Sequence, residues 1–137
     1  VESGERVRGA AERVRPQMVL VVDALAAREP ERVCTTVQLA DSGIVPGSGV
    51  GNARSALTEE TLGVPVVAVG VPTVVDARTL CADLSGAEID LLEDTELFVT
   101  PRDIDTRVRD SARLVGYAID LALHDALTIE DIDMFLA

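Results

Sequence analysis

Apolar residues follow two patterns along the chain, and the two patterns alternate. Continuous apolar, β-branched runs occur at 18–22 and 64–71, which is typical of strands buried on both faces. Between them, residues 33–39 alternate, with Val33, Val37 and Leu39 on one side. We therefore predict three strands, the first of which ends at Asp23.

The second pattern, apolar residues at helical spacing, predicts helices over 3–15, 53–62, 72–84, 101–124 and 129–136. Pro16 would end the first helix, and Pro72 would begin the third. Thr100 and Pro101 together predict a cap and a first helical position for the long fourth helix. This alternation predicts an α/β fold, a three-layer sandwich with a mostly parallel central sheet flanked by helices.

Composition limits what this fold can be. The chain has 137 residues, of which 47% are apolar, enough for the core of one domain over 1–137. Only 2% are aromatic, so the core must be packed from aliphatic side chains. The net charge of −12 argues against nucleic-acid binding, since a phosphate backbone is bound by clustered cations.

Cysteine spacing and hydropathy exclude further classes. Cys34 and Cys81 lie far apart, without the spacing of a zinc site or a disulfide framework, so we expect no metal and no cofactor. No segment reaches about 18 consecutive apolar residues, and the first fifteen are charged throughout, which predicts neither a membrane span nor a signal peptide. We expect a cytoplasmic protein.

A glycine-rich loop is the first candidate site. Gly47, Gly49 and Gly51 alternate with other residues, so backbone amides there could approach a ligand closely. The loop lacks the lysine of a phosphate-binding P-loop and the third glycine of a dinucleotide fingerprint. It is either a tight structural turn or a loop that binds a polar backbone. In the second case its candidate substrate-binding residues are Gly47, Ser48, Gly49, Gly51, Asn52 and Arg54.

Three carboxylates form the second candidate site. Asp23, Asp41 and Asp76 each follow an apolar stretch, and the carboxyl ends of parallel strands meet where open α/β sheets bind ligands. Carboxylates gathered there can act as acid and base in hydrolysis. Asp23 is the stronger candidate, because Asp41 and Asp76 could instead serve turns or helix caps. His124, the single histidine, lies near a predicted helix end and fits a contact with the helix dipole better than catalysis.

The order of these motifs resembles the germination protease family of spore-forming bacteria. The resemblance rests on VVDALAAREPERV at 21–33, TTVQLADSGIVPGSGVGNARSALTEETLGVPVVAVGVPTVVDA at 35–77, LFVTPRDID at 97–105 and LALHDALTIEDIDMFL at 121–136. These segments span nearly the whole chain. The family loop usually reads IHPGSGVGN, and here Val45 stands in place of its histidine.

The resemblance implies a fold and an activity. The fold would be similar to that of hydrogenase-maturation proteases. The activity would be that of an atypical aspartic-type endopeptidase that cleaves small acid-soluble spore proteins during germination, in the cytoplasm of the spore core. Two aspartates from different halves of the enzyme would serve hydrolysis, and Asp23 matches the second of them. The glycine loop would hold the substrate backbone, with Asp41 and Asp76 as possible supporting residues.

The resemblance also implies what is missing. The first catalytic aspartate belongs to an upstream segment with no counterpart here, so the chain corresponds to the carboxyl-terminal half of a longer enzyme. Alone it would be inactive, with the amino-terminal half as a partner and a homo-oligomer, a tetramer in the family, as the assembly. Two alternatives stay open: a non-catalytic binding or assembly domain, and a metal-assisted maturation-type protease that would need His124 beside Asp23 and Asp76.

Overall fold

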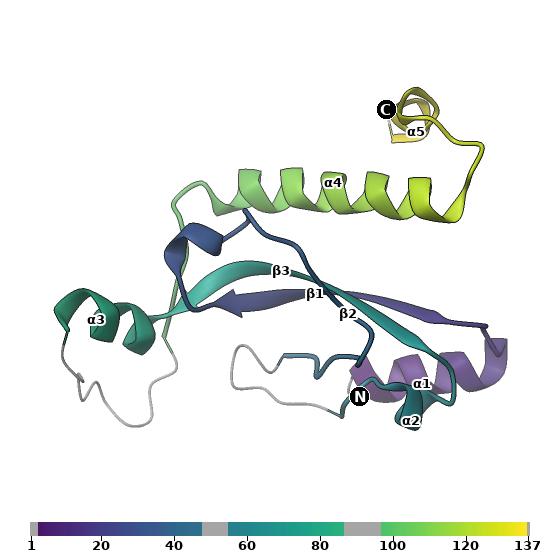
Figure 1. The fold of residues 1–137 in the computed structure, drawn as a ribbon, viewed down its shortest axis with the longest axis horizontal. Coiled ribbons are helices and arrows are strands. Elements are labelled where there is room, and N and C mark those ends of the chain that lie inside the picture. The colour runs from purple at the N-terminus through teal and green to yellow at the C-terminus, as the bar shows by residue number, and fades with distance from the viewer. Residues whose placement is uncertain (1–2, 48–54, 87–96, 137) are drawn as a thin grey trace. The chain divides into compact units, whose positions relative to one another are not determined.

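A computed structural model of the protein describes residues 3–47, 55–86 and 97–136. It divides into two compact units, Val1–Pro101 and Arg102–Ala137, each described here by itself. The elements of the first unit are α1 (Ser3–Val14), β1 (Val19–Ala27), the 3-10 helix η1 (Pro30–Arg32), β2 (Gln38–Ala40), α2 (Glu59–Leu62), β3 (Val66–Asp76), α3 (Ala77–Ser85) and β4 (Phe98–Val99) (Figure 1). The second unit contains α4 (Ile104–Leu123) and α5 (Ile129–Leu136).

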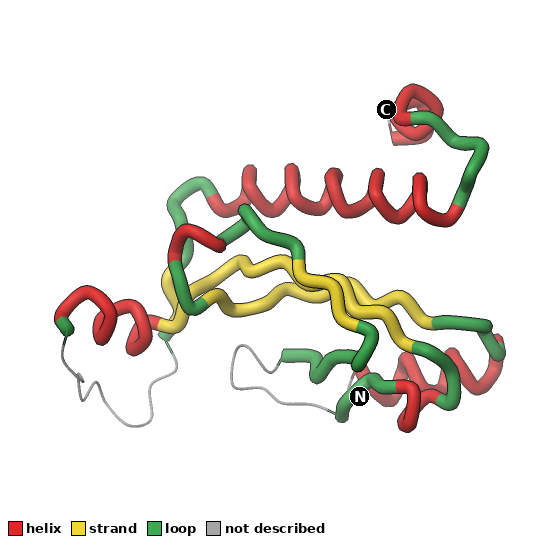
Figure 2. Tube along the Cα trace, viewed as in Figure 1, coloured by secondary structure: helices red, strands yellow, loops and turns green. Residues whose placement is uncertain are grey.

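A mixed four-stranded sheet organises the first unit, and β3 lies at its centre. β1 pairs with β3 in parallel along the whole of β1, from Val19 opposite Val66 to Ala27 opposite Val75. The other edge of β3 carries β2 and β4, both antiparallel (Figure 2). The fold is thus α/β, as predicted, but the expectation of a mostly parallel sheet is wrong. The short strands β2 and β4 run antiparallel to β3, so β1 is its one parallel neighbour among the described strands.

The core of this unit follows β3. Its buried side chains include Val66, Ala68, Val69 and Val75, on both faces of the strand. The continuous apolar run in the sequence reflects this two-sided burial. Figure 1 shows α1 and α2 on the same side of the sheet. Gly4, in the first turn of α1, packs closely against Ser55: a Cβ added at Gly4 would stand 3.2 Å from the Ser55 carbonyl oxygen.

β1 is longer than the hydrophobic pattern predicts. The apolar run ends at Asp23, yet the strand continues through Asp23 to Ala27. Asp23 is tolerated in mid-strand because its side chain is only half-buried and accepts a backbone hydrogen bond. The loop or helical turn predicted directly after Asp23 is therefore wrong for residues 24–27.

β3 also extends further than predicted, through Pro72 to Asp76. Pro72 does not begin a helix, although proline is common at that position. It lies at an irregularity of the parallel pairing: Leu25 is opposite Pro72, Ala26 is opposite Val74, and Thr73 is the extra residue. A bulge is one of the places where a sheet accepts proline, which cannot donate to the ladder. The helix begins instead at Ala77, with Asp76 as its cap.

Only the end of the predicted second strand pairs. The strand expected at 33–39 appears as β2, Gln38–Ala40, preceded by η1, whose first residue is Pro30. Val33 is not on a strand face but is 1% exposed, and the N–H of Cys34 donates to the Pro72 carbonyl at 2.7 Å. Period-two alternation is shared by such a loop and a strand, so the pattern could not separate them.

The second unit pairs a long helix with a short one. α4 begins at Ile104, and Asp103 rather than Thr100 stands before it. Thr100 is therefore too far from the helix to cap it, and its hydroxyl donates to the Thr73 carbonyl at 2.9 Å. α5 has the predicted bounds, and Thr128 and Asp131 exchange the hydrogen bonds expected of its cap.

Candidate functional site

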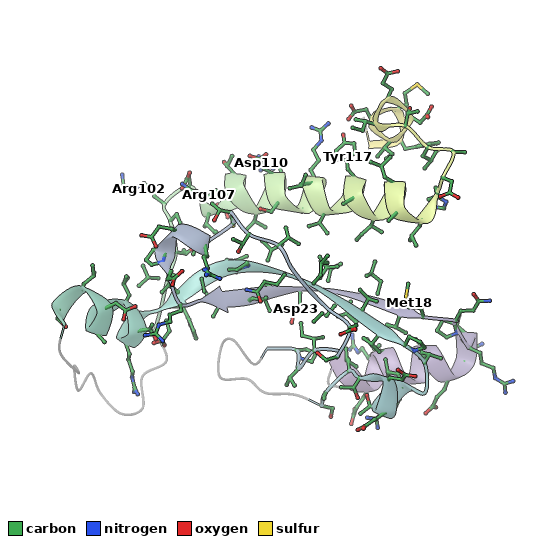
Figure 3. The ribbon with its side chains drawn as sticks, viewed as in Figure 1. Met18, Asp23, Arg102, Arg107, Asp110 and Tyr117 are labelled. Atoms are coloured by element: carbon green, nitrogen blue, oxygen red, sulfur yellow. The ribbon has the colours of Figure 1, made fainter. Side chains whose placement is uncertain are left out.

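Asp23 lies in the middle of β1, opposite Gly70 of β3. Figure 3 shows its side chain on the side of the sheet where α1 and α2 lie, and Met18 on the opposite side. Asp23 is half-buried, and its Oδ1 accepts a hydrogen bond from the Ala24 backbone N–H at 2.9 Å. The other oxygen has no hydrogen bond among the described residues, so the carboxylate retains accepting capacity for a water or a substrate group.

The row that contains Asp23 crosses three strands. Gly70 is opposite Asp23 on one side and opposite Gln38 of β2 on the other. Cross-strand partners share a face, so a carboxylate and an amide flank a residue without a side chain. The space above Gly70 is taken by Leu25, because a Cβ there would stand 2.3 Å from Leu25 Cδ1. The glycine therefore serves the packing of Leu25, and the polar groups of the row are Asp23 and Gln38.

The three candidate carboxylates do not gather at one edge of the sheet. Asp76 follows Gly70 by six residues on β3, which is about 20 Å of extended chain. Asp41 comes directly after β2 at the opposite end, where Ala40 is opposite Ala68. The expected cluster is wrong because β2 runs antiparallel and Asp23 is in mid-strand. Asp23 is thus the candidate carboxylate of the central row.

Asp76 has a structural role. Its Oδ1 accepts hydrogen bonds from the Thr79 backbone N–H at 2.8 Å and from the Thr79 hydroxyl at 3.1 Å. These bonds cap the first turn of α3. The cap alternative is confirmed for Asp76, while Asp41 is exposed beyond the end of β2.

The glycine-rich loop lies mostly outside the described residues, which include Gly47 but not Ser48, Gly49, Gly51, Asn52 or Arg54. Its two stems are held together by an antiparallel bridge. Ile44 and Leu57 exchange backbone hydrogen bonds of 3.0 and 2.8 Å, and Leu57 is 3% exposed. Gly43 has a φ of 86°, and a Cβ there would stand 2.1 Å from the Leu57 carbonyl oxygen. The bridge therefore needs glycine at position 43.

Within residues 3–47, 55–86 and 97–136, no group of three or more His, Cys, Asp or Glu side chains is arranged to hold a metal ion. His124 ends α4 and is exposed. In the same ranges, no helix combines the length and the apolar character required to cross a bilayer.

Sequence reasoning missed one apolar cavity in the first unit. It has a volume of about 220 Å³ and is lined chiefly by Pro30, Val33, Val75, Leu80, Val99 and Thr100. These residues come from β3, α3, η1 with the residue after it, and β4 with the residue after it, so only the pairing of β4 with β3 brings them together. No local pattern in the sequence could have indicated it.

Comparison with known proteins identifies the family. A family model described as germination protease matches residues 1–92, more than half of the chain. The germination protease of Clostridium tetani is 36% identical over 168 residues, covering 99% of this chain and 52% of that protein. That of Bacillus subtilis is 55% identical over 83 residues, covering 61% of this chain and 23% of that protein. The chain belongs to the germination protease family, which is a family of peptidases.

The extent of these matches matters for function. The chain spans about half the length of the curated clostridial relatives that it matches. The alignment is longer than the chain, so those relatives also carry residues within the matched region that this chain lacks.

Proposed function

We propose that this chain is the carboxyl-terminal half of an endopeptidase that degrades small acid-soluble spore proteins during germination. Asp23 is its catalytic carboxylate and acts on the water that attacks the peptide bond. The observation that carries the proposal is family membership together with the position of Asp23, the one candidate carboxylate in the central row of the sheet.

The surroundings of Asp23 suit this role. A general base must reach a water or a substrate proton at hydrogen-bond distance. Among the described residues only one carboxylate oxygen is engaged, by the Ala24 N–H, and that bond fixes the orientation of the group. Asp23 lies in the middle of a nine-residue strand that pairs with β3 along its whole length, and rigid support of a catalytic group favours rate.

The glycine loop and the other partners complete the proposal. Gly47, Ser48, Gly49, Gly51, Asn52 and Arg54 hold the substrate backbone, and their amides stabilise the developing oxyanion. The amino-terminal half of the enzyme supplies the second aspartate, so this chain alone is inactive. The working assembly is a homotetramer in the cytoplasm of the spore core.

Replacement of Asp23 tests the proposal. In the polypeptide that contains both halves, Asp23→Asn keeps the size of the side chain but removes the base. We expect cleavage of a small acid-soluble spore protein to fall by about 10²–10⁴-fold, the usual contribution of general acid–base catalysis. Asp110 is an exposed carboxylate within α4, so Asp110→Asn is the matched control and should retain activity (Figure 3). Turnover by Asp23→Asn at the control rate would contradict the assignment.

A second candidate function is favoured by the length of the chain. Because it spans only about half of its clostridial relatives, it could be a non-catalytic binding or assembly domain of this family. Such a domain would bind an intact spore protein without cleaving it when joined to the amino-terminal half. Cleavage in that assay distinguishes the enzyme from the binding domain.

A further inference from the structure

Gln38 is the second polar side chain of the row that contains Asp23. The row runs from Asp23 on β1 through Gly70 on β3 to Gln38 on β2, three strands that lie side by side (Figure 1). Paired residues on neighbouring strands place their side chains on the same face of a sheet. Neighbouring strands are about 4.8 Å apart, so the Cα atoms of Asp23 and Gln38 are about 10 Å apart. The two side chains thus share a face, with one strand between them.

The rows on either side of this one are apolar. Their members on β1, β3 and β2 are Val21, Ala68 and Ala40 in one row, and Leu25 and Pro72 in the other. Among these described strand residues, Asp23 and Gln38 are therefore the polar side chains of an otherwise apolar face. Ligand sites are typically built in this way, from apolar surroundings and a few polar groups that converge on the ligand.

The space between Asp23 and Gln38 has an apolar base. Gly70 contributes no side chain, and Leu25 covers it, since a Cβ added at Gly70 would stand 2.3 Å from Leu25 Cδ1. A peptide group placed over Leu25 would therefore have a carboxylate on one side and an amide on the other. Apolar surroundings strengthen hydrogen bonds to such a group, because less water screens them.

The side-chain amide of Gln38 is free to contact a substrate. Gln38 is exposed, and its side chain makes no hydrogen bond to any of the described residues. A glutamine amide carries two N–H donors and one carbonyl acceptor, whereas an ionised aspartate only accepts. The row thus combines an acceptor that can take a proton with a neutral donor that cannot lose one.

We infer that Gln38 is a further catalytic residue of the proposed peptidase, and that its side-chain N–H donates to the carbonyl oxygen of the peptide bond that is cleaved. The inference deepens the proposed function, on which it rests for the role of Asp23. Side-chain amides are among the groups that stabilise oxyanions in acyl transfer. Gln38 adds a donor held on a strand to the backbone amides proposed for the glycine loop.

The proposed step conserves atoms, protons and electrons. Water transfers a proton to Asp23 while its oxygen bonds to the carbonyl carbon, and the π electron pair of the C=O bond moves to the oxygen that Gln38 contacts. When the C=O bond forms again, the C–N bond breaks and the amine leaves with the proton from Asp23. Gln38 neither gains nor loses a proton. Its hydrogen bond strengthens as negative charge develops, so it favours the transition state over the bound substrate.

Steady-state kinetics of Gln38→Ala tests the inference in the polypeptide that contains both halves. We expect kcat for cleavage of a small acid-soluble spore protein to fall by about 10²–10³-fold, the usual loss for one oxyanion donor. KM should change by less than about threefold, because the oxyanion exists only in the transition state. Gln17→Ala, at an exposed position before β1, is the matched control and should keep both constants. A kcat for Gln38→Ala equal to that of the control would overturn the inference.

Gln38→Glu separates donation from packing and decides the question if Gln38→Ala does not fold. Glutamate has nearly the size of glutamine, but its ionised carboxylate cannot donate, so kcat near pH 7 should again fall about 10²-fold or more. The ratio of this kcat to that of the unmodified polypeptide should rise about tenfold between about pH 7 and about pH 5, since protonation gives the carboxyl group an O–H donor. A ratio independent of pH would show a structural role and overturn the inference.

Asp23→Asn, assayed beside these variants, distinguishes the two proposals. Full turnover by Asp23→Asn would remove the proposed function and, with it, the role inferred for Gln38. Loss of turnover in Asp23→Asn together with full activity of Gln38→Ala and Gln38→Glu would overturn the inference alone. Loss in all three variants, with the ratio for Gln38→Glu rising as the pH falls, is the result expected for an N–H donor at Gln38.

Discussion

The side chain of Leu25 takes the space that a Cβ at Gly70 would need, at the centre of the sheet. The pair lies in the strand that carries Asp23 and in its partner, two residues from the candidate carboxylate. Interiors of proteins are close-packed, so a methyl group added here must displace Leu25. Displacement of Leu25 would also disturb the neighbouring position of Asp23.

Gly70→Ala should therefore destabilise the protein. The new Cβ would stand 2.3 Å from Leu25 Cδ1, and overpacking of this kind costs about 1–3 kcal/mol. Urea unfolding measures the change. Gly9→Ala, in α1 with nothing within 4 Å of the new Cβ, is the control and should be stabilising by up to about 1 kcal/mol.

Adding Leu25→Ala to Gly70→Ala should cost less unfolding free energy than the sum of the two single changes. Strict additivity would show that the two positions do not compete for space.

The sequence predicts the two apolar strands correctly but not the residues at which they end. Both apolar runs became strands, yet each extends beyond the residue at which the pattern stops, Asp23 in β1 and Pro72 in β3. Pairing between β1 and β3 explains both: residues 24–27 continue the parallel ladder, and a bulge at Thr73 accommodates the proline. The same long-range pairing placed Asp41 and Asp76 away from Asp23, which no local pattern could reveal. The candidate residues could be named from the sequence, but which of them lie close together depends on how the strands pair in the sheet.

The cap of α3 can be tested at the scale of the element. Asp76→Ala removes the acceptor for the Thr79 N–H and should cost about 1 kcal/mol of unfolding free energy. Asp76→Asn retains an acceptor oxygen and should restore most of that loss. Chemical denaturation compares the three proteins. Equal losses in both variants would point to a role for the charge rather than for the cap.

The cap of α5 predicts a dependence on pH. Hydrogen bonds from the side chain and the backbone of Thr128 lower the pKa of Asp131 below its usual 3.8. A carboxyl group whose pKa is lowered by folding stabilises the folded state at pH values above its usual pKa. This stabilisation is lost as the pH falls through the lowered pKa. Helix content should therefore decline less steeply in Asp131→Asn than in the unmodified chain between about pH 5 and about pH 2.

Circular dichroism at each pH measures this effect. Thr128→Val removes the hydroxyl donor and should bring the profile closer to that of Asp131→Asn. Asp133 also has a lowered pKa, because of hydrogen bonds from the Tyr117 hydroxyl and from Arg113, so part of the acid loss should persist in both variants. Identical profiles for all three chains would contradict a contribution from Asp131.

At the scale of the whole molecule, charge is the dominant property. Twenty-four acidic residues face twelve arginines, which leaves a net charge of −12. Among the described residues, the ion pairs are exposed and use few of these carboxylates, for example Arg107 with Asp103 at 3.0 Å. A compact chain with this excess repels itself, and salt screens the repulsion.

Salt should accordingly raise the stability of the protein near neutral pH. We expect the thermal midpoint to rise by a few degrees between about 0.01 M and about 0.15 M sodium chloride, as the Debye length falls from about 30 to about 8 Å. The control is the same series near pH 4.3, the isoelectric point, where the net charge vanishes and the increase should be much smaller. An equal increase at both pH values would assign the effect to something other than net charge.

The central position of β3 also determines when the sheet can form during synthesis. In the described part of the chain, β1, β2 and β4 each pair with β3 and not with one another. A nascent chain that ends before Val66 therefore lacks the one strand that pairs with β1 and β2 among the described residues, although both have already been made. Such non-local pairing slows folding and leaves apolar strands exposed in the meantime. The ribosome must complete β3 before β1 and β2 can pair with it.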